Sequence, residues 1–137
     1  MKQNISIEDI NKLTDIQKEK LRELWQPVPG DVFYYSDGNN WYCHNGEYIC
    51  FNYEDGFIGI GNERSLYKSF CFPLFSIGQM IEILGKNLSS LGITSGKYYV
   101  VIDKIIDQET GEMWNCEEPE LCDALWNAIV DFMLEEE

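Results

Sequence analysis

Three segments of the chain combine a helix-start signal with apolar residues at helical spacing. Thr14-Asp15-Ile16-Gln17 has the spacing of a capping box, in which the first and fourth side chains cap each other's backbone N–H groups. Ser76-Ile77-Gly78-Gln79 repeats that spacing, and Pro119 suits the first turn of a third helix. The pattern predicts helices at 14–25, 76–86 and 119–134, with a shorter turn from Ser6 before the first of them.

Aromatic and β-branched runs predict strands in the middle of the chain, at 32–35, 41–44, 47–53 and 57–60. They are separated by Asp37-Gly38, Asn45-Gly46 and Asp55-Gly56, dipeptides that favour tight hairpin turns.

A later run, 98–106, is apolar on both alternating faces apart from Asp103 and Lys104, which is typical of a central strand. The Ser- and Gly-rich residues before this run are expected to form a loop, and 113–116 is expected to pair back with the strand. Together these elements predict one α+β domain over residues 1–137. We expect an antiparallel sheet of about four to six strands with the three main helices packed on it.

The last predicted helix is apolar around most of its circumference. Its polar side chains fall within about 120° of a helical wheel, and every other residue from Leu121 to Leu134 is apolar. Such a helix is either wedged between two layers of its own fold or in contact with another protein. Under the second interpretation, Trp126, Phe132 and Met133 are the candidate subunit contacts.

Composition and charge exclude several classes of protein. Hydrophobic residues make up 45% of the 137 residues, which is enough for a core and argues against intrinsic disorder. Lys and Arg number 10 against 24 Asp and Glu, a formal net charge of -14. A phosphate backbone or an anionic membrane would repel so acidic a chain, so we expect neither direct nucleic-acid nor membrane binding.

The cellular setting is predicted from the absence of targeting signals. Neither a secretory peptide nor an apolar run of roughly 18 residues, as a membrane span needs, is visible in the sequence. The five cysteines are odd in number and lack short paired spacings. We therefore expect reduced thiols in the cytoplasm of the cell.

Candidate chemistry is sparse. His44, the single histidine, adjoins Cys43 in a predicted strand, where neighbouring side chains point to opposite faces. No cysteine pair has zinc-ligand spacing, and Gly92 to Lys97 lacks the spacing of a phosphate-binding loop. We predict no catalytic residue, no metal and no cofactor. A small enzyme or ligand-binding protein that uses the aromatic hairpins stays the third alternative.

Negative charge is concentrated in the last third of the chain. Residues 97–137 hold two basic and twelve acidic side chains. Such a surface could imitate the phosphate rows of a nucleic acid and bind a basic groove, or it could simply keep the protein soluble. The candidate partner-binding residues are Glu117, Glu118, Glu120, Asp123, Asp131 and Glu135.

Three segments of the chain, taken in order, resemble parts of known proteins. They are Leu21-Arg22-Glu23-Leu24-Trp25 with Pro27 and Gly30-Asp31, then Pro73-Leu74-Phe75-Ser76-Ile77-Gly78-Gln79-Met80-Ile81-Glu82, then Glu120-Leu121-Cys122-Asp123-Ala124-Leu125-Trp126. In this order they resemble small uncharacterised proteins encoded in phages and prophages of Gram-positive bacteria. The resemblance covers about a third of the chain and includes no catalytic motif. It implies a phage-derived accessory protein, and small acidic phage proteins often bind and block a host or defence protein, as anti-CRISPR proteins do.

The leading functional prediction is a non-enzymatic, acidic protein-binding module of phage or prophage origin. Its expected partner is a host or defence protein with a basic, nucleic-acid-binding surface in a bacterial cytoplasm. The alternative is a homo-oligomeric structural or accessory phage protein, such as a homodimer, in which the apolar last helix makes the subunit contact.

Overall fold

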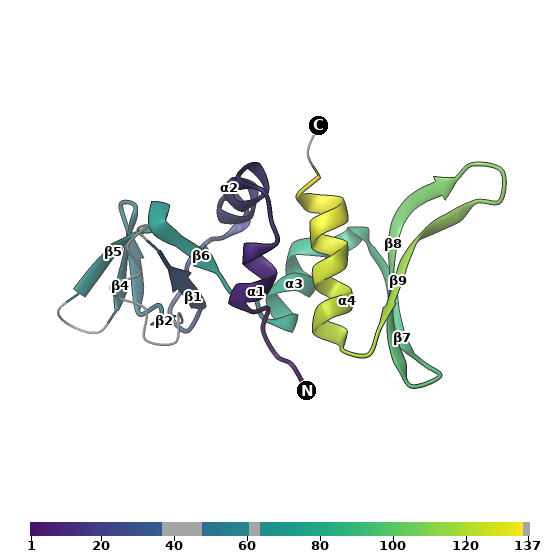
Figure 1. Cartoon of the computed structure of the whole chain (residues 1–137), viewed down its shortest axis with the longest axis horizontal. Coiled ribbons are helices and arrows are strands. Elements are labelled where there is room, and N and C mark those ends of the chain that lie inside the picture. Colours follow the sequence, from purple (N-terminus) through teal and green to yellow (C-terminus); the bar gives the residue numbers. More distant parts are fainter. Residues whose placement is uncertain (37–47, 61–63, 136–137) are drawn as a thin grey trace. The chain divides into compact units, whose positions relative to one another are not determined.

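The computed structural model describes residues 1–36, 48–60 and 64–135. Within them, four α-helices and three small antiparallel sheets confirm the α+β class (Figure 1). The chain forms two compact units. We call Ser6–Phe75 the N-terminal unit, and Ser76–Glu137 together with Met1–Ile5 the C-terminal unit. The single domain over residues 1–137 stays a prediction.

The helices of the N-terminal unit begin at capping boxes. Helix α1 (Ile7–Asn11) follows Ser6, whose side chain and that of Asp9 cap each other's backbone. Helix α2 (Asp15–Leu24) follows Thr14 and Gln17 in the same arrangement, as predicted. After α2 a cluster of rings forms part of the core, with Trp25 and Phe33 5.7 Å apart and Phe33 and Tyr48 5.6 Å apart between centroids.

Two three-stranded sheets complete the N-terminal unit. Strand β1 (Val32–Tyr35) lies between β2 (Tyr48–Ile49) and β6 (Cys71–Pro73), which follows a 3₁₀ turn at Lys68–Phe70. Strand β4 (Phe57–Ile60) lies between β3 (Asn52–Glu54) and β5 (Arg64–Tyr67). The predicted Asp55-Gly56 turn joins β3 to β4, with φ angles of 49° and 84° that suit a two-residue hairpin loop.

The expectation of one sheet with four to six strands is wrong in this detail, because the predicted strand 47–53 is divided between two sheets. Cys50 donates its N–H to the carbonyl of Asp31, while the next residue, Phe51, donates to the carbonyl of Gly59. Consecutive residues therefore bond in different directions, and the ladder cannot continue. The predicted strand 41–44 and the turns at Asp37-Gly38 and Asn45-Gly46 lie outside the described residues.

The C-terminal unit carries the third sheet. Helix α3 (Ile77–Leu84) begins at the predicted Ser76–Gln79 capping box and runs into a 3₁₀ turn at Gly85–Asn87. Strand β8 (Lys97–Asp107) is the central strand, as predicted, between β7 (Leu88–Thr94) and β9 (Glu112–Glu118).

Strand β7 occupies residues that the sequence predicts as a loop, so that expectation is wrong. Ser and Gly have low strand propensity, which hid the strand. A Cβ at Gly92 would lie 2.7 Å from the Tyr99 hydroxyl oxygen, so the tyrosine ring uses the space that glycine leaves open. Ser95 and Gly96, with φ angles of 51° and 78°, form the turn into β8.

Helix α4 (Leu121–Ala128) is buried inside the C-terminal unit. It contacts α3 as well as β8 and β9, which lie on its other side in Figure 1. Its last turn, Ile129–Met133, is π-helical, and the Leu134 N–H donates to the Ile129 carbonyl at 3.1 Å. The two predicted layers are therefore the sheet and α3, and the structure favours burial of the wide apolar arc within the fold.

Candidate protein-binding surface

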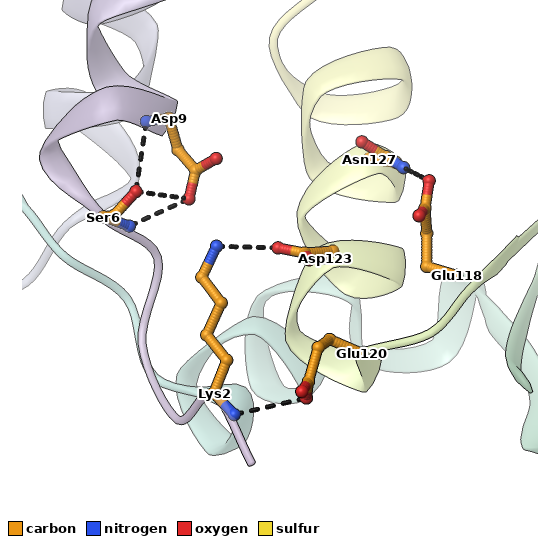
Figure 2. Close-up of polar contacts among 7 residues, drawn as sticks. All are labelled: Lys2, Ser6, Asp9, Glu118, Glu120, Asp123 and Asn127. Atoms are coloured by element: carbon orange, nitrogen blue, oxygen red, sulfur yellow. Dashed lines mark hydrogen bonds and ion pairs between the residues drawn. The ribbon is translucent and has the colours of Figure 1, made fainter.

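The acidic residues at the start of α4 are paired with the N-terminal segment. The Lys2 backbone N–H donates to Glu120 Oε2 at 3.2 Å, and the Lys2 ammonium lies 2.7 Å from Asp123 Oδ1 (Figure 2). The segment itself is held because the Gln3 carbonyl accepts the Ile77 N–H at 3.0 Å. Asp123 is thus paired with a cation of the chain itself, and the Glu120 carboxylate is hydrogen-bonded to the N-terminal backbone.

A polar side chain in the middle of α4 forms hydrogen bonds with strand β9. Asn127 Nδ2 donates to Glu118 Oε1 at 3.0 Å (Figure 2). The same nitrogen donates to Cys116 Sγ at 3.3 Å. Burial, together with the nearby carboxylates of Glu118 and Asp131, raises the pKa of the Cys116 thiol, although the Asn127 hydrogen bond opposes the change. The hydrogen bonds of Asn127 therefore help to position the helix on the sheet.

Two acids at the C-terminal end of this region, Asp131 and Glu135, contact the sheet as well. Trp114 Nε1 donates to Asp131 Oδ2 at 3.3 Å, and Lys104 Nζ lies 3.6 Å from Glu135 Oε2. Glu117, by contrast, is exposed on β9, and its carboxylate forms no hydrogen bond or ion pair with another described residue. Most of the six candidate partner-binding acids are therefore engaged in contacts within the chain, and Glu117 has the carboxylate that is most available to a partner.

A second acidic feature is an extension of the sheet. Strand β7 stops pairing at Leu88 opposite Ile102, whereas β8 and β9 continue to Asp107 opposite Glu112. We call this two-stranded extension, residues 103–115, the acidic arm (Figure 1). It holds four acids (Asp103, Asp107, Glu109 and Glu112) and one base (Lys104), a net charge of -3.

The acidic arm also exposes large apolar side chains. Ile105 is 49% exposed and Ile106 is 54% exposed. Its turn is ordered, since Asp107 Oδ1 accepts the backbone N–H groups of Glu109 at 2.9 Å and Thr110 at 3.3 Å. These hydrogen bonds hold the pKa of the Asp107 carboxyl below its ordinary value. Apolar and anionic groups on a preformed hairpin suit a partner surface with both apolar and basic residues.

The candidate subunit contacts on α4 lie mostly inside the fold. Trp126 is 6% exposed, and Phe132 and Met133 are half-buried. The helix therefore gives little support to the homo-oligomer alternative.

Ile105 and Ile106 are surface residues that the sequence analysis missed. Their apolar character predicts burial on both faces of a central strand, and the neighbouring strand ends before it reaches them. The charged pair Asp103-Lys104 inside the apolar run is the signal that could have marked the change. Lys2 was missed because its partners are more than a hundred residues away in the sequence.

The described residues offer little catalytic or metal-binding chemistry. No group of three or more His, Cys, Asp or Glu among them could hold a metal ion. Burial raises the pKa of Cys71 to about 12 and also raises that of Cys50, so neither thiol is ionised near neutral pH. Cys43 and His44 lie outside the described residues, and the absence of an active site, metal and cofactor stays a prediction.

Comparison with known proteins gives no family for this chain. No protein-family model, curated protein or solved structure matches it. Among the described helices, none is long and apolar enough to cross a membrane. The phage resemblance thus stays a prediction.

Proposed function

We propose that the protein is a non-enzymatic protein-binding module whose acidic arm contacts a basic partner protein. The observation that carries the proposal is the exposure of Ile105 and Ile106 on the same ordered hairpin as the exposed acids Glu109 and Glu112. Large exposed apolar side chains that lie close together, with polar groups around them, often mark a protein-binding surface. The two isoleucines share their hairpin with carboxylates, which fits such a surface.

The partner's chemistry is derived from the arm. A surface of Lys or Arg around an apolar patch would complement both kinds of side chain, and steering by opposite charge would accelerate association. Proteins that bind nucleic acids have such surfaces. The sequence resembles phage and prophage proteins, and a partner of this chemistry fits inhibition of a nucleic-acid-binding protein of the host or its defence in the bacterial cytoplasm.

The test is capture of partners from a Gram-positive bacterial lysate, followed by mass spectrometry. We expect the chain to retain a basic nucleic-acid-binding protein at about 50 mM salt and to release it at about 500 mM, because salt screens exposed charges. The double variant E109K/E112K should retain little of the captured protein.

The matched control is E23K/E82K, which makes the same change in net charge at two exposed acids that do not belong to the arm. It should bind as the unaltered chain does. Equal losses in both variants would contradict the proposal, because net charge alone would then explain capture. A salt-resistant dimer in sedimentation, with no captured protein, would instead support the homo-oligomeric alternative.

A further inference from the structure

The sheet β3-β4-β5 has one buried face and one exposed face. Ile58 and Leu66, directly opposite each other on neighbouring strands, are buried. On the other face, Glu54, Phe57 and Tyr67 form one cross-strand row. Phe57 is 41% and Tyr67 is 56% exposed, and their ring centroids are 4.8 Å apart. We call these three residues the aromatic row.

The next row on the same face is small and polar. It consists of Asn52, Gly59 and Ser65. A Cβ at Gly59 would lie 2.3 Å from Asn52 Oδ1, so the asparagine side chain lies across the glycine. The two rings therefore stand beside a low polar surface and remain accessible from that side.

The N-terminal unit already places cations on other aromatic rings. Lys68 Nζ lies 5.5 Å from the centre of the Tyr53 ring, and Arg22 Cζ lies 4.5 Å from that of Phe72. Lys68 also donates to the Trp25 carbonyl at 3.1 Å, so its ammonium is committed elsewhere. No described cation lies over Phe57 or Tyr67.

The carboxylate of the row is equally unpaired. Glu54 is exposed, forms no ion pair with a described residue, and stands directly opposite Phe57 across the hairpin. Side chains directly opposite each other in an antiparallel pair are about 5 Å apart at Cβ. One cation could thus contact a ring face and the carboxylate together.

We propose that the aromatic row binds an arginine side chain presented by a partner protein. The planar guanidinium would stack on Phe57 or Tyr67 while two of its N–H groups donate to Glu54. Arginine suits this place better than lysine because its flat group can stack and form paired hydrogen bonds at once. The inference stands independently of the acidic arm, which lies in the other unit.

A peptide titration of the full chain tests this inference. The probe is a capped peptide of alternating glycine and arginine, and its reference replaces each arginine with neutral citrulline of the same shape. Binding is followed by NMR chemical shifts. We expect the arginine peptide to move the Phe57 and Tyr67 resonances and to bind at least about fivefold more tightly than the citrulline peptide.

Variants assign the binding to the row. Y67A and E54Q should each weaken the arginine peptide about threefold or more, and both positions are exposed enough to leave the fold intact. The control F51A removes a 56% exposed ring outside the row and should change nothing. The arm variant E109K/E112K should also keep the shifts at the row, which separates this test from that of the arm.

Three results would overturn the inference. Equal affinity for the citrulline peptide would show that the charge is irrelevant. Equal losses in F51A and Y67A would show that no specific ring is involved. Shifts confined to the acidic arm would assign the peptide to the other surface.

Discussion

Helix α4 and strand β8, whose end forms part of the acidic arm, both have wide apolar patterns in sequence, but the fold buries the helix and exposes the end of the strand. The helix has a far wider apolar arc than one sheet can cover, and it is buried because α3 covers it from a second direction. The apolar run 98–106 has the pattern of a central strand, yet Ile105 and Ile106 are exposed because β7 begins at Leu88, opposite Ile102, and does not reach them. The apolar pattern of a segment thus indicates how much of its surface would gain from burial. Whether that surface is buried depends on how far the neighbouring strands and helices extend.

The largest effect should come from truncating a buried side chain of α4. Leu125 is fully buried, so L125A should lower the free energy of unfolding by about 2–5 kcal/mol through lost burial and a cavity. Urea denaturation measures the change. The matched control L91A, at a leucine that is 39% exposed on β7, should cost much less. Similar losses in the two variants would contradict the assigned burial.

A smaller effect is expected where the N-terminal segment meets α4. The Lys2 and Asp123 side chains are 29% and 38% exposed, so solvent screens their ion pair. K2M should therefore lower the free energy of unfolding by only about 0.5 kcal/mol. The loss should shrink as salt is raised in the same urea titrations, and a loss that is independent of salt would point to packing instead of charge.

The arm should tolerate polar replacement of its isoleucines. I106T should change the free energy of unfolding by less than about 0.5 kcal/mol, because the side chain is 54% exposed. The same variant should weaken capture of the basic partner. A large loss of stability would show that the isoleucines of the arm are buried in solution. They would then not be available to contact a partner.

The smallest effect is local to the turn of the arm. The carboxylate of Asp107 accepts two backbone N–H groups, so its folded-state pKa is depressed. Its contribution to the turn is therefore present above the unfolded-state pKa and is lost as pH falls through the folded-state value.

Amide hydrogen exchange at Glu109 and Thr110 measures that contribution. D107N should accelerate their exchange at neutral pH while the rest of the sheet is unchanged. Unaltered exchange would mean that the turn does not depend on the carboxylate.

Local signals made the helices predictable. Capping boxes at Thr14 and Ser76 lie within four residues, and the structure confirms both. The Asp55-Gly56 turn was equally local. The division of the sheets was not, since it depends on Cys50 and Phe51 bonding to residues far away in the sequence.

The candidate surface was predicted only in part. Sequence identified where the acids are concentrated, and Glu117 is indeed exposed. It could not show that Glu120 and Asp123 are paired with Lys2, because that contact joins the two ends of the chain. Nor could the sequence show that β8 extends beyond the end of β7, because this depends on the register of three strands.

The π-helical turn at Ile129–Met133 holds one residue more than an α-helical turn needs. The Leu134 N–H bonds the Ile129 carbonyl five residues back, so deleting one residue between them would make this contact an ordinary four-residue α-helical bond. Leu134 would then stay buried, and Glu135 would stay near Lys104. The end of the protein is therefore expected to tolerate the loss of one residue in this turn better than the loss of one residue within α4.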